Sequence, residues 1–315
     1  MRSATAIATM ICSAYPTLES FYAAIYKPRR LLGCSPTTDK HYRVAIRHLD
    51  RYFGRQTTLA DIADEDRCAD FMEQFSEGRQ PATIATQRSQ MIALLTLAHR
   101  RGMIAIVPDI PTVAQYRDAP DSLTVAEMHS LINAARSAEG NVCGVPAQYY
   151  WTANFLIVYD TGVRTRALYG IEICQLRLDT PAIIFPPENM KNRHGMILRI
   201  SSSTAAIIRR CLAPRRRLLF PEPWCEATRY SRVRDFFRAA GLPCGHRDLY
   251  QKLRRTTATM THEHGGDACA QLGHSSDSVT RKHYIDPSHT IQAADLLDHP
   301  WAESIQAADR QGRLF

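Results

Sequence analysis

The chain has 315 residues, of which 45% are hydrophobic and 22% are charged, and its formal net charge is +8. This is ordinary globular composition with room for about two domains and enough apolar residues for real cores. No stretch reaches the roughly 18 apolar residues that a membrane span needs. The basic balance fits a polyanionic partner such as nucleic acid, although charge alone does not establish one.

The nine cysteines are odd in number, scattered along the chain and free of any Cys-x-x-Cys pair. This usage favours reduced thiols in a cytoplasmic protein, and it argues against a zinc site or a disulfide framework. Residues 4–14 faintly resemble a signal peptide, but Thr5, Thr9 and Ser13 interrupt the apolar run. We therefore expect no signal peptide and a cytoplasmic location.

The N-terminal part of the chain shows helical periodicity. We predict helices over 17–30, from Ser35-Pro36 to about 53, over 64–75 and over 81–101, with residues 59–62 as a short connector. Four helices in about 85 residues predict a small all-α domain.

Basic residues follow one face of the second of these helices, three or four positions apart, and a further arginine lies on the long fourth helix. The residues are Lys40, Arg43, Arg47, Arg51 and Arg88. An ordinary solvated face and a phosphate-facing stripe both fit this pattern. A stripe would contact the DNA backbone, which supplies affinity without reading sequence.

Residues 104–122 lose all periodicity and contain three prolines, which marks a linker. A capping box, Thr124–Glu127, then starts a new helix. The sequence therefore divides into an N-terminal helical domain at 1–105, a linker at 106–122 and a second domain at 123–315.

After the helix that starts at the capping box, the second domain continues with a buried helix over 148–159 that ends at Gly162, where glycine allows the chain to turn. A strand over 171–178 and a hairpin with a polar tip follow. The hairpin strands are 182–185 and 196–200. Further helical segments are expected at 204–212, 227–240, 247–262, 267–272, 275–284 and 291–297.

Five residues in distant segments are of the types that attack a phosphodiester without a metal. They are Arg164, Lys191, Arg254, His274 and Tyr284. Arginine neutralises phosphate charge with a planar fork of donors. A tyrosine can act as a nucleophile and conserve the bond energy in a covalent link, and a lysine on a hairpin tip can protonate the leaving oxygen.

These segments resemble the boxes of the tyrosine recombinases, also called the phage integrase family, over about residues 17–290. Thr161–Arg164 resembles the first arginine box, Lys191 the hairpin lysine and Leu253–Thr259 the second arginine box. Leu272–Ser276, with Thr280 and Tyr284, resembles the third box and the nucleophile. Their common order and spacing make the resemblance specific.

The resemblance implies a mainly α fold with a small β-sheet: an all-α, SAM-like core-binding domain followed by an α+β catalytic domain. It implies a site-specific recombinase or integrase of a mobile element, acting as a homo-tetramer on paired double-stranded DNA sites. Tyr284 would form a 3′-phosphotyrosyl link, and Arg164, Arg254 and His274 would bind the phosphate. Lys191 would protonate the leaving oxygen, and no metal or nucleotide cofactor would be needed.

Two positions depart from the family pattern. Ala167 stands where the first box usually has an acidic residue, and Gln251 stands where the second box usually has a histidine. Glutamine can hydrogen-bond a phosphate but cannot accept a proton. Activation of Tyr284 would then depend on the field of the arginines, on His274 or on His283, unless His246 replaces the missing histidine.

Two alternative functions stay open on the sequence. One is a DNA-binding or architectural protein of the same fold with weakened catalysis, which the changes at Ala167 and Gln251 suggest. The other is an enzyme like topoisomerase IB that relaxes DNA as a monomer.

Overall fold

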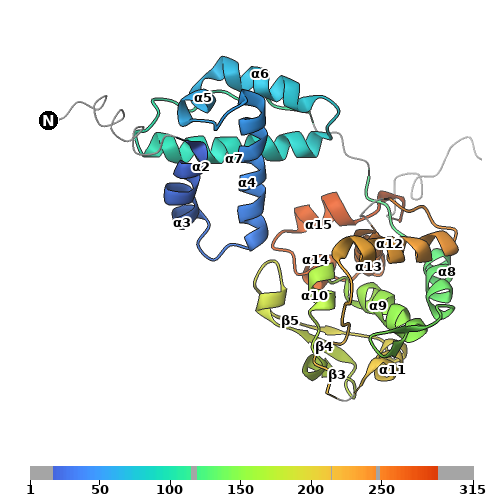
Figure 1. The fold of residues 1–315 in the computed structure, drawn as a ribbon. Coiled ribbons are helices and arrows are strands. Elements are labelled where there is room, and N and C mark those ends of the chain that lie inside the picture. Colours follow the sequence, from blue (N-terminus) through green and yellow to red (C-terminus); the bar gives the residue numbers. More distant parts are fainter. Residues whose placement is uncertain (1–16, 115–118, 214, 246–248, 290–315) are drawn as a thin grey trace, which may run out of the picture. The chain divides into compact units, whose positions relative to one another are not determined.

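The computed structural model describes residues 17–114, 119–213, 215–245 and 249–289. The chain divides between Arg117 and Asp118 into two compact units, here called the N-terminal unit and the C-terminal unit (Figure 1). Each unit has its own cluster of buried apolar side chains. His246 and the predicted segment at 291–297 lie outside the described residues.

The described part of the N-terminal unit is entirely helical. Its elements are α2 (Leu18–Phe21), a π-helical turn (Tyr22–Tyr26), α3 (Lys27–Arg30), α4 (Pro36–Phe53), α5 (Leu59–Ala63), α6 (Glu65–Ser76) and α7 (Pro81–Arg100). The first three run on from one another and fill the predicted helix at 17–30. Ser35 caps α4 and Gly54, at φ 64°, ends it, so the predicted proline start holds.

The predicted connector at 59–62 is wrong, because these residues form helix α5. Thr58 and Asp61 make a reciprocal capping box at its start. The Asp61 carboxylate also accepts hydrogen bonds from Arg55 and Arg67 at 2.6–2.8 Å. Such side-chain caps satisfy the exposed amides of a first turn and let a helix of five residues form.

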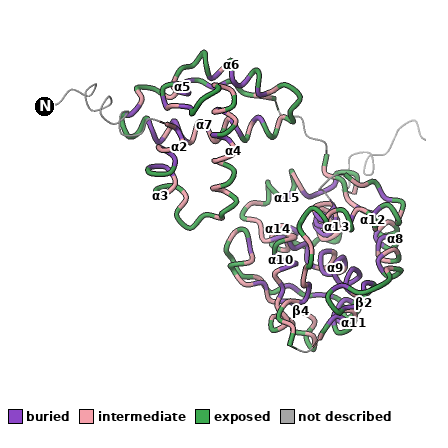
Figure 2. The backbone as a smooth tube through the Cα atoms, in the orientation of Figure 1, coloured by how far each residue is buried: buried purple, intermediate pink, exposed green. Residues whose placement is uncertain are grey.

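The core of the N-terminal unit lies where α4, α6 and α7 bring their apolar faces together. Ile46, Leu49, Phe71 and Leu95 are each at most 2% exposed. Figure 2 shows buried and exposed residues alternating along these helices. The exposed face of α4 carries the predicted basic stripe.

The C-terminal unit begins with helix α8 and is built on helix α9. Its helices are α8 (Val125–Arg136), α9 (Ala147–Thr161), α10 (Thr165–Tyr169), α11 (Ser202–Cys211), α12 (Glu226–Ala239), α13 (Leu249–Glu263), α14 (Ala268–Leu272) and α15 (Asp277–Tyr284). The short 3-10 helices are η2 (Ile173–Gln175), η3 (Pro187–Asn189) and η4 (Pro287–His289). Helix α9 is largely buried because α8, α11 and α13 pack around it, and most of its side chains are apolar.

A small antiparallel sheet of β3 (Leu176–Arg177), β4 (Ala182–Phe185) and β5 (Met196–Arg199) lies beside these helices, in the order β3-β4-β5. The hairpin register pairs Ile183 with Leu198, and the predicted hairpin holds. The predicted strand at 171–178 is mostly wrong, because Glu172 and Gln175 cap each other and form η2 instead. A short hairpin was not predicted; its strands, β1 (Asn141–Val142) and β2 (Val145–Pro146), have two residues each.

The observed fold is therefore mainly α with a small sheet, as predicted. The long loop between β4 and β5 and the segment from α13 to α15 carry most of the predicted site residues.

Candidate active site

The predicted site centres on Arg254, which lies on α13 and is only 1% exposed. Its guanidinium donates to the Gly162 carbonyl oxygen and, at 2.9 Å, to the Leu272 carbonyl oxygen. It also lies 2.9 Å from Nε2 of His274 and 5.3 Å from the centre of the Tyr284 ring. Arg254 therefore joins three segments that are far apart in sequence.

Arg254 forms no ion pair with any carboxylate of the described residues, and its buried Nε has no hydrogen-bond partner there. Burial and the nearby charge of Arg164 lower the pKa of Arg254 to about 10. The group is still charged at neutral pH. A buried cation without a protein counter-charge is costly, so this place favours an anionic ligand.

His274 contacts Arg254 through one ring nitrogen and Thr280 through the other. Nδ1 lies 2.9 Å from the Thr280 hydroxyl oxygen. Because arginine can only donate, Nε2 of His274 must accept, and the proton lies on Nδ1. Burial, with the charges of Arg254 and Arg164, lowers the pKa of His274 to about 4. The imidazole is therefore neutral near pH 7.

Tyr284 is the last residue of α15 and is 8% exposed. Its ring centre lies 4.6 Å from that of His274. Burial alone would raise the pKa of Tyr284, but hydrogen bonding with Gln251 and the charges of Arg254 and Arg164 outweigh burial and lower it. Gln251 lies on α13, one turn before Arg254, where its side chain reaches the phenol.

The backbone at Tyr284 and just after it is fixed within the same chain. The Thr259 hydroxyl donates to the Tyr284 carbonyl oxygen at 3.2 Å and accepts from the Asp286 amide at 3.0 Å. The Asp286 carboxylate accepts from the Ser122 amide at 2.8 Å and from its hydroxyl at 3.0 Å. The tyrosine is thus presented to its own chain's arginine.

Arg164 follows the glycine turn that ends α9. Gly162 has φ 63°, and an added Cβ would lie 2.5 Å from Cδ2 of Leu272, so only glycine fits there. Arg164 caps α10 and is half-buried. Its side chain makes no hydrogen bond or ion pair with another described residue. Ala167, where an acidic residue was expected from the family pattern, is buried in the core.

Lys191 lies in the exposed loop between β4 and β5. Its neighbour Asn192 donates a hydrogen bond to the Gly273 carbonyl oxygen at 2.6 Å. The loop is therefore attached next to His274. The structure brings Arg254, His274, Tyr284, Gln251 and the charge of Arg164 together, and it places Lys191 in this adjoining loop.

The basic residues predicted on the N-terminal unit fall into two groups. Lys40, Arg47 and Arg51 are exposed on α4. Arg43 instead pairs with Glu19 and Asp39. Arg88 donates to the Ile110 carbonyl oxygen at 2.8 Å. The first three are therefore available to a ligand, whereas Arg43 and Arg88 have contacts within their own unit.

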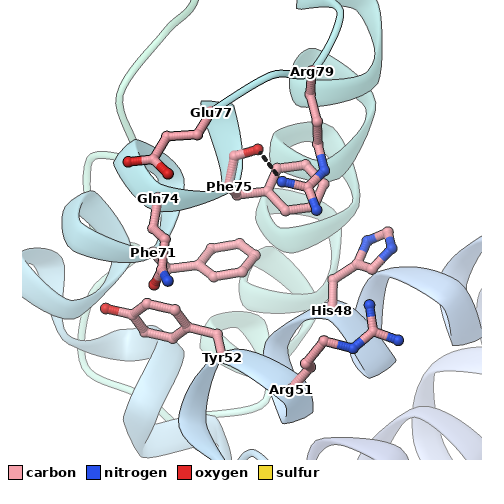
Figure 3. A pocket seen from close by; sticks show the side chains of 8 residues that line it. All are labelled: His48, Arg51, Tyr52, Phe71, Gln74, Phe75, Glu77 and Arg79. Carbon is pink, nitrogen blue, oxygen red and sulfur yellow. Dashed lines mark hydrogen bonds between the residues drawn. The ribbon is translucent and has the colours of Figure 1, made fainter.

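A cavity of about 330 Å³ opens at the C-terminal end of α4 (Figure 3). His48 and Arg51 lie on one side of it, and the Arg79 guanidinium lies 4.2 Å from the centre of the Phe75 ring. The cavity lies at the end of the exposed basic face and adds Arg79 to it.

Sequence reasoning missed several residues that hold the site. Thr280 and Thr259 were noted only as parts of boxes, Asn192 lay unremarked in the polar hairpin tip, and Asp286 was not noted at all. Their signal is weak in a sequence because each acts through a contact with a distant segment.

Among the described residues, no group of three His, Cys, Asp or Glu residues is placed to hold a metal ion. No described helix is both long and apolar enough to span a membrane.

Comparison with known proteins identifies the family of the chain. The family model "Phage integrase family" matches residues 121–290, more than half of the chain. A search of curated protein sequences found no match.

Solved structures with the same fold include the Tn1549 transposon integrase (14% identity, TM-score 0.67), covering 94% of this chain and 99% of that one. The match to the lambda integrase fragment 75–356 (17% identity, TM-score 0.66) covers 88% of this chain and 98% of that one. The match to the XerH site-specific recombinase (16% identity, TM-score 0.65) covers 86% of this chain and 82% of that one.

Fold and family together define a class of enzyme, the DNA strand-transferases that act through a tyrosine. The chain belongs to the phage integrase family and is a site-specific tyrosine recombinase.

Proposed function

We propose that Tyr284 of this chain cuts one strand of double-stranded DNA and holds it as a 3′-phosphotyrosyl link. The observation that carries the proposal is the charge of the site. Two guanidinium groups act on Tyr284, one of them buried, and neither has a carboxylate partner among the described residues. A phosphodiester supplies the missing negative charge.

In the proposed step, the phenol oxygen of Tyr284 attacks phosphorus, the P–O5′ bond breaks and a bond from the tyrosine oxygen to phosphorus forms. Arg164 and Arg254 donate to the non-bridging oxygens as charge builds on them. His274 adds no charge at neutral pH, and it orients Arg254 through Nε2. The attack of a 5′-hydroxyl from a partner strand reverses the step and rejoins the DNA.

Lys191 is proposed to donate the proton that the leaving O5′ takes up. A lysine can act as a general acid only when it reaches the leaving atom. The bond from Asn192 to Gly273 supports this role because it ties the loop beside His274.

Gln251 is proposed to stabilise the phenolate of Tyr284 as a hydrogen-bond donor, in place of a histidine that removes its proton. The lowered pKa of Tyr284 supports this, since Gln251 and both arginines favour the charged form. The accepting nitrogen of His274 is already bonded to Arg254, which argues against His274 as the base. The phenol proton then leaves to water.

The N-terminal unit is proposed to grip the DNA core site through Lys40, Arg47 and Arg51, with Arg43 and Arg88 as supporting residues. The XerH, lambda and Tn1549 structures are each described as complexes with DNA. The phage integrase reaction exchanges strands between two sites, so we propose a homo-tetramer on paired sites of a mobile element.

The test is covalent capture of DNA. The chain is incubated with sheared genomic DNA of its source and with nicked duplexes from the DNA that flanks its coding sequence. Adducts are then recovered under denaturing conditions. The wild-type chain should yield an adduct, and Tyr284→Phe should abolish it.

Three outcomes would contradict parts of this proposal. An adduct that survives Tyr284→Phe would exclude this tyrosine as the nucleophile. Specific binding without any adduct would favour an architectural protein, and relaxation of supercoiled DNA by a monomer would favour an enzyme like topoisomerase IB.

A further inference from the structure

Three buried polar side chains form a chain of hydrogen bonds behind the site. The hydroxyl oxygens of Tyr169 and Tyr250 are 2.7 Å apart, and the Tyr250 hydroxyl donates to Oδ1 of Asn154 at 2.6 Å. Each hydroxyl has one proton, so Tyr169 donates to Tyr250 and Tyr250 to Asn154. Asn154 is fully buried and Tyr250 is 3% exposed.

These residues come from the elements that carry the two arginines. Tyr169 ends α10, which Arg164 caps, and Asn154 lies on α9, which leads into the Gly162 turn. Tyr250 lies on α13 four residues before Arg254, so both lie on one face of that helix, one turn apart. It also directly precedes Gln251, which contacts Tyr284.

Further hydrogen bonds join α13 to α9 on the C-terminal side of Arg254. The Thr257 hydroxyl lies 2.9 Å from the carbonyl oxygens of Val158 and Tyr159. Arg254 is thus bracketed by a polar contact one turn before it and another one turn after it. A core held by apolar packing alone would allow α13 to slide or rotate more easily, because such packing is not directional.

Buried polar groups of this kind are costly unless they are bonded, and where they are bonded they specify one arrangement. In Asn154 this holds for Oδ1, which accepts from Tyr250, whereas its Nδ2 has no partner among the described residues. Burial raises the pKa of Tyr250 well above its ordinary value, so its hydroxyl keeps the proton that it donates to Asn154. The chain of bonds is therefore intact across the physiological pH range.

We infer that Tyr169, Tyr250 and Asn154 are positioning residues for strand cleavage, which set Arg164, Arg254 and Gln251 at the spacing that the scissile phosphate requires. They do not touch the DNA. The inference rests on the proposed function, since it assumes that the two arginines act on one phosphate.

The test uses Tyr250→Phe and Tyr169→Phe, which keep the rings and remove the hydroxyl groups. The matched control is Tyr150→Phe, another fully buried tyrosine on α9, whose hydroxyl donates to the Pro221 carbonyl oxygen at 3.3 Å. All three variants lose one hydroxyl from the same core, but only the first two break the bonds between the arginine-bearing elements.

The measurement is the single-turnover rate of adduct formation at saturating DNA, on a nicked duplex carrying the captured site. Tyr250→Phe and Tyr169→Phe should each slow it roughly 10–100-fold, because small displacements of catalytic groups cost rates of this size. DNA affinity should stay within about twofold, and Tyr150→Phe should keep the wild-type rate. The double variant should be little slower than the slower single variant, since both break one chain of bonds.

The dependence of the rate on pH gives a second readout. Displacing Gln251 should move the alkaline rise of the rate to higher pH in Tyr250→Phe, but not in Tyr150→Phe. Melting temperatures lowered in all three variants with unchanged rates would overturn the inference, and so would equal losses of rate and affinity. If Tyr250→Phe fails to fold, Tyr169→Phe decides. A wild-type chain that forms no adduct would refute the proposed function instead.

Discussion

The two arginines at the site differ in how the protein holds them. Arg254 is buried and donates to two backbone carbonyls, so it is part of the structure as well as of the site. Arg164 is half-buried and has no side-chain partner among the described residues. A substitution of Arg164 therefore tests the chemistry with little effect on the fold. A substitution of Arg254 would disturb the fold as well as the chemistry.

Arg164→Ala should slow cleavage by about 10²–10³, the usual cost of losing one donor to a developing oxyanion. The melting temperature should not fall, because the substitution also removes the repulsion between Arg164 and Arg254. Single-turnover cleavage and thermal unfolding, measured together, check this. Arg166→Ala, two residues along on the exposed side of α10, is the control and should cleave normally. A fall in both rate and melting temperature would contradict the prediction.

His274 should make the C-terminal unit sensitive to acid. Its pKa is about 4 in the folded chain, below the ordinary value near 6.5. Between these values the unfolded chain binds more protons, so the stability from neutral His274 is present above about pH 6.5 and is lost as pH falls toward 4. After solvent screening this amounts to about 1–2 kcal/mol. Denaturant unfolding at pH 7.5 and 5 should show the loss, and His274→Gln should reduce it.

At the level of elements, the site depends on close contact between the Gly162 turn and α14. Gly162 needs a positive φ, its carbonyl accepts from Arg254, and Leu272 lies against it. The next two residues after Leu272 are Gly273 and His274. A shift of this turn would therefore reach Arg254 and His274 together.

Gly162→Ala should destabilise the C-terminal unit by about 2–4 kcal/mol, because backbone strain and a displaced Leu272 add up. It should also slow cleavage. Gly241→Ala is the matched control: its φ is 71°, but nothing lies within 4 Å of the added Cβ. It should cost only about 1 kcal/mol and leave cleavage unchanged. Equal effects of the two changes would show that strain alone matters at residue 162.

Elements set by local chemistry could be predicted from the sequence. The start of α4 at Pro36, the capping box at Thr124 and the turn at Gly162 each depend on residues within a few positions. Helix α5 and η2 were missed because they are short and owe their ends to side-chain caps that resemble loop residues.

That Arg254, His274 and Tyr284 would lie together could be predicted from the sequence, but their contacts could not. The sequence proposed these three by residue type and by their resemblance to the family's boxes. That the accepting nitrogen of His274 is bonded to Arg254 depends on helices that meet only in the folded chain. Arg43 is the reverse case: its spacing suited a DNA-facing stripe, but Glu19, 24 residues earlier, lies against it.

At the level of the whole molecule, the positive charge available to DNA is spread over both units. Lys40, Arg47 and Arg51 lie exposed on the N-terminal unit, and Arg164 and Arg254 lie in the C-terminal unit. The first group should set affinity and the second should set rate, since backbone contacts bind DNA and transition-state contacts speed the reaction.

The combined change of Lys40, Arg47 and Arg51 to alanine should flatten the salt dependence of DNA binding. Each lost phosphate contact lowers the slope of log affinity against log salt by about 0.9, so the slope should fall by about 2–3. Arg43→Ala should leave the slope nearly unchanged, because Glu19 and Asp39 already neutralise Arg43. Titrations at several salt concentrations measure both. A similar slope change for both variants would argue against the division of these residues into two groups.

The hydrogen bonds from Ser122 to Asp286 limit where this enzyme could be joined to another protein in a chimera. Asp121 pairs with Lys252 and Arg255 on α13, and Ser122 holds the backbone just after Tyr284. A chimera that grafts a foreign DNA-binding module at residue 123 would discard both residues and loosen the segment that presents the nucleophile. A junction at or before residue 119 would keep them, so retargeting this recombinase depends on two residues at the edge of its linker.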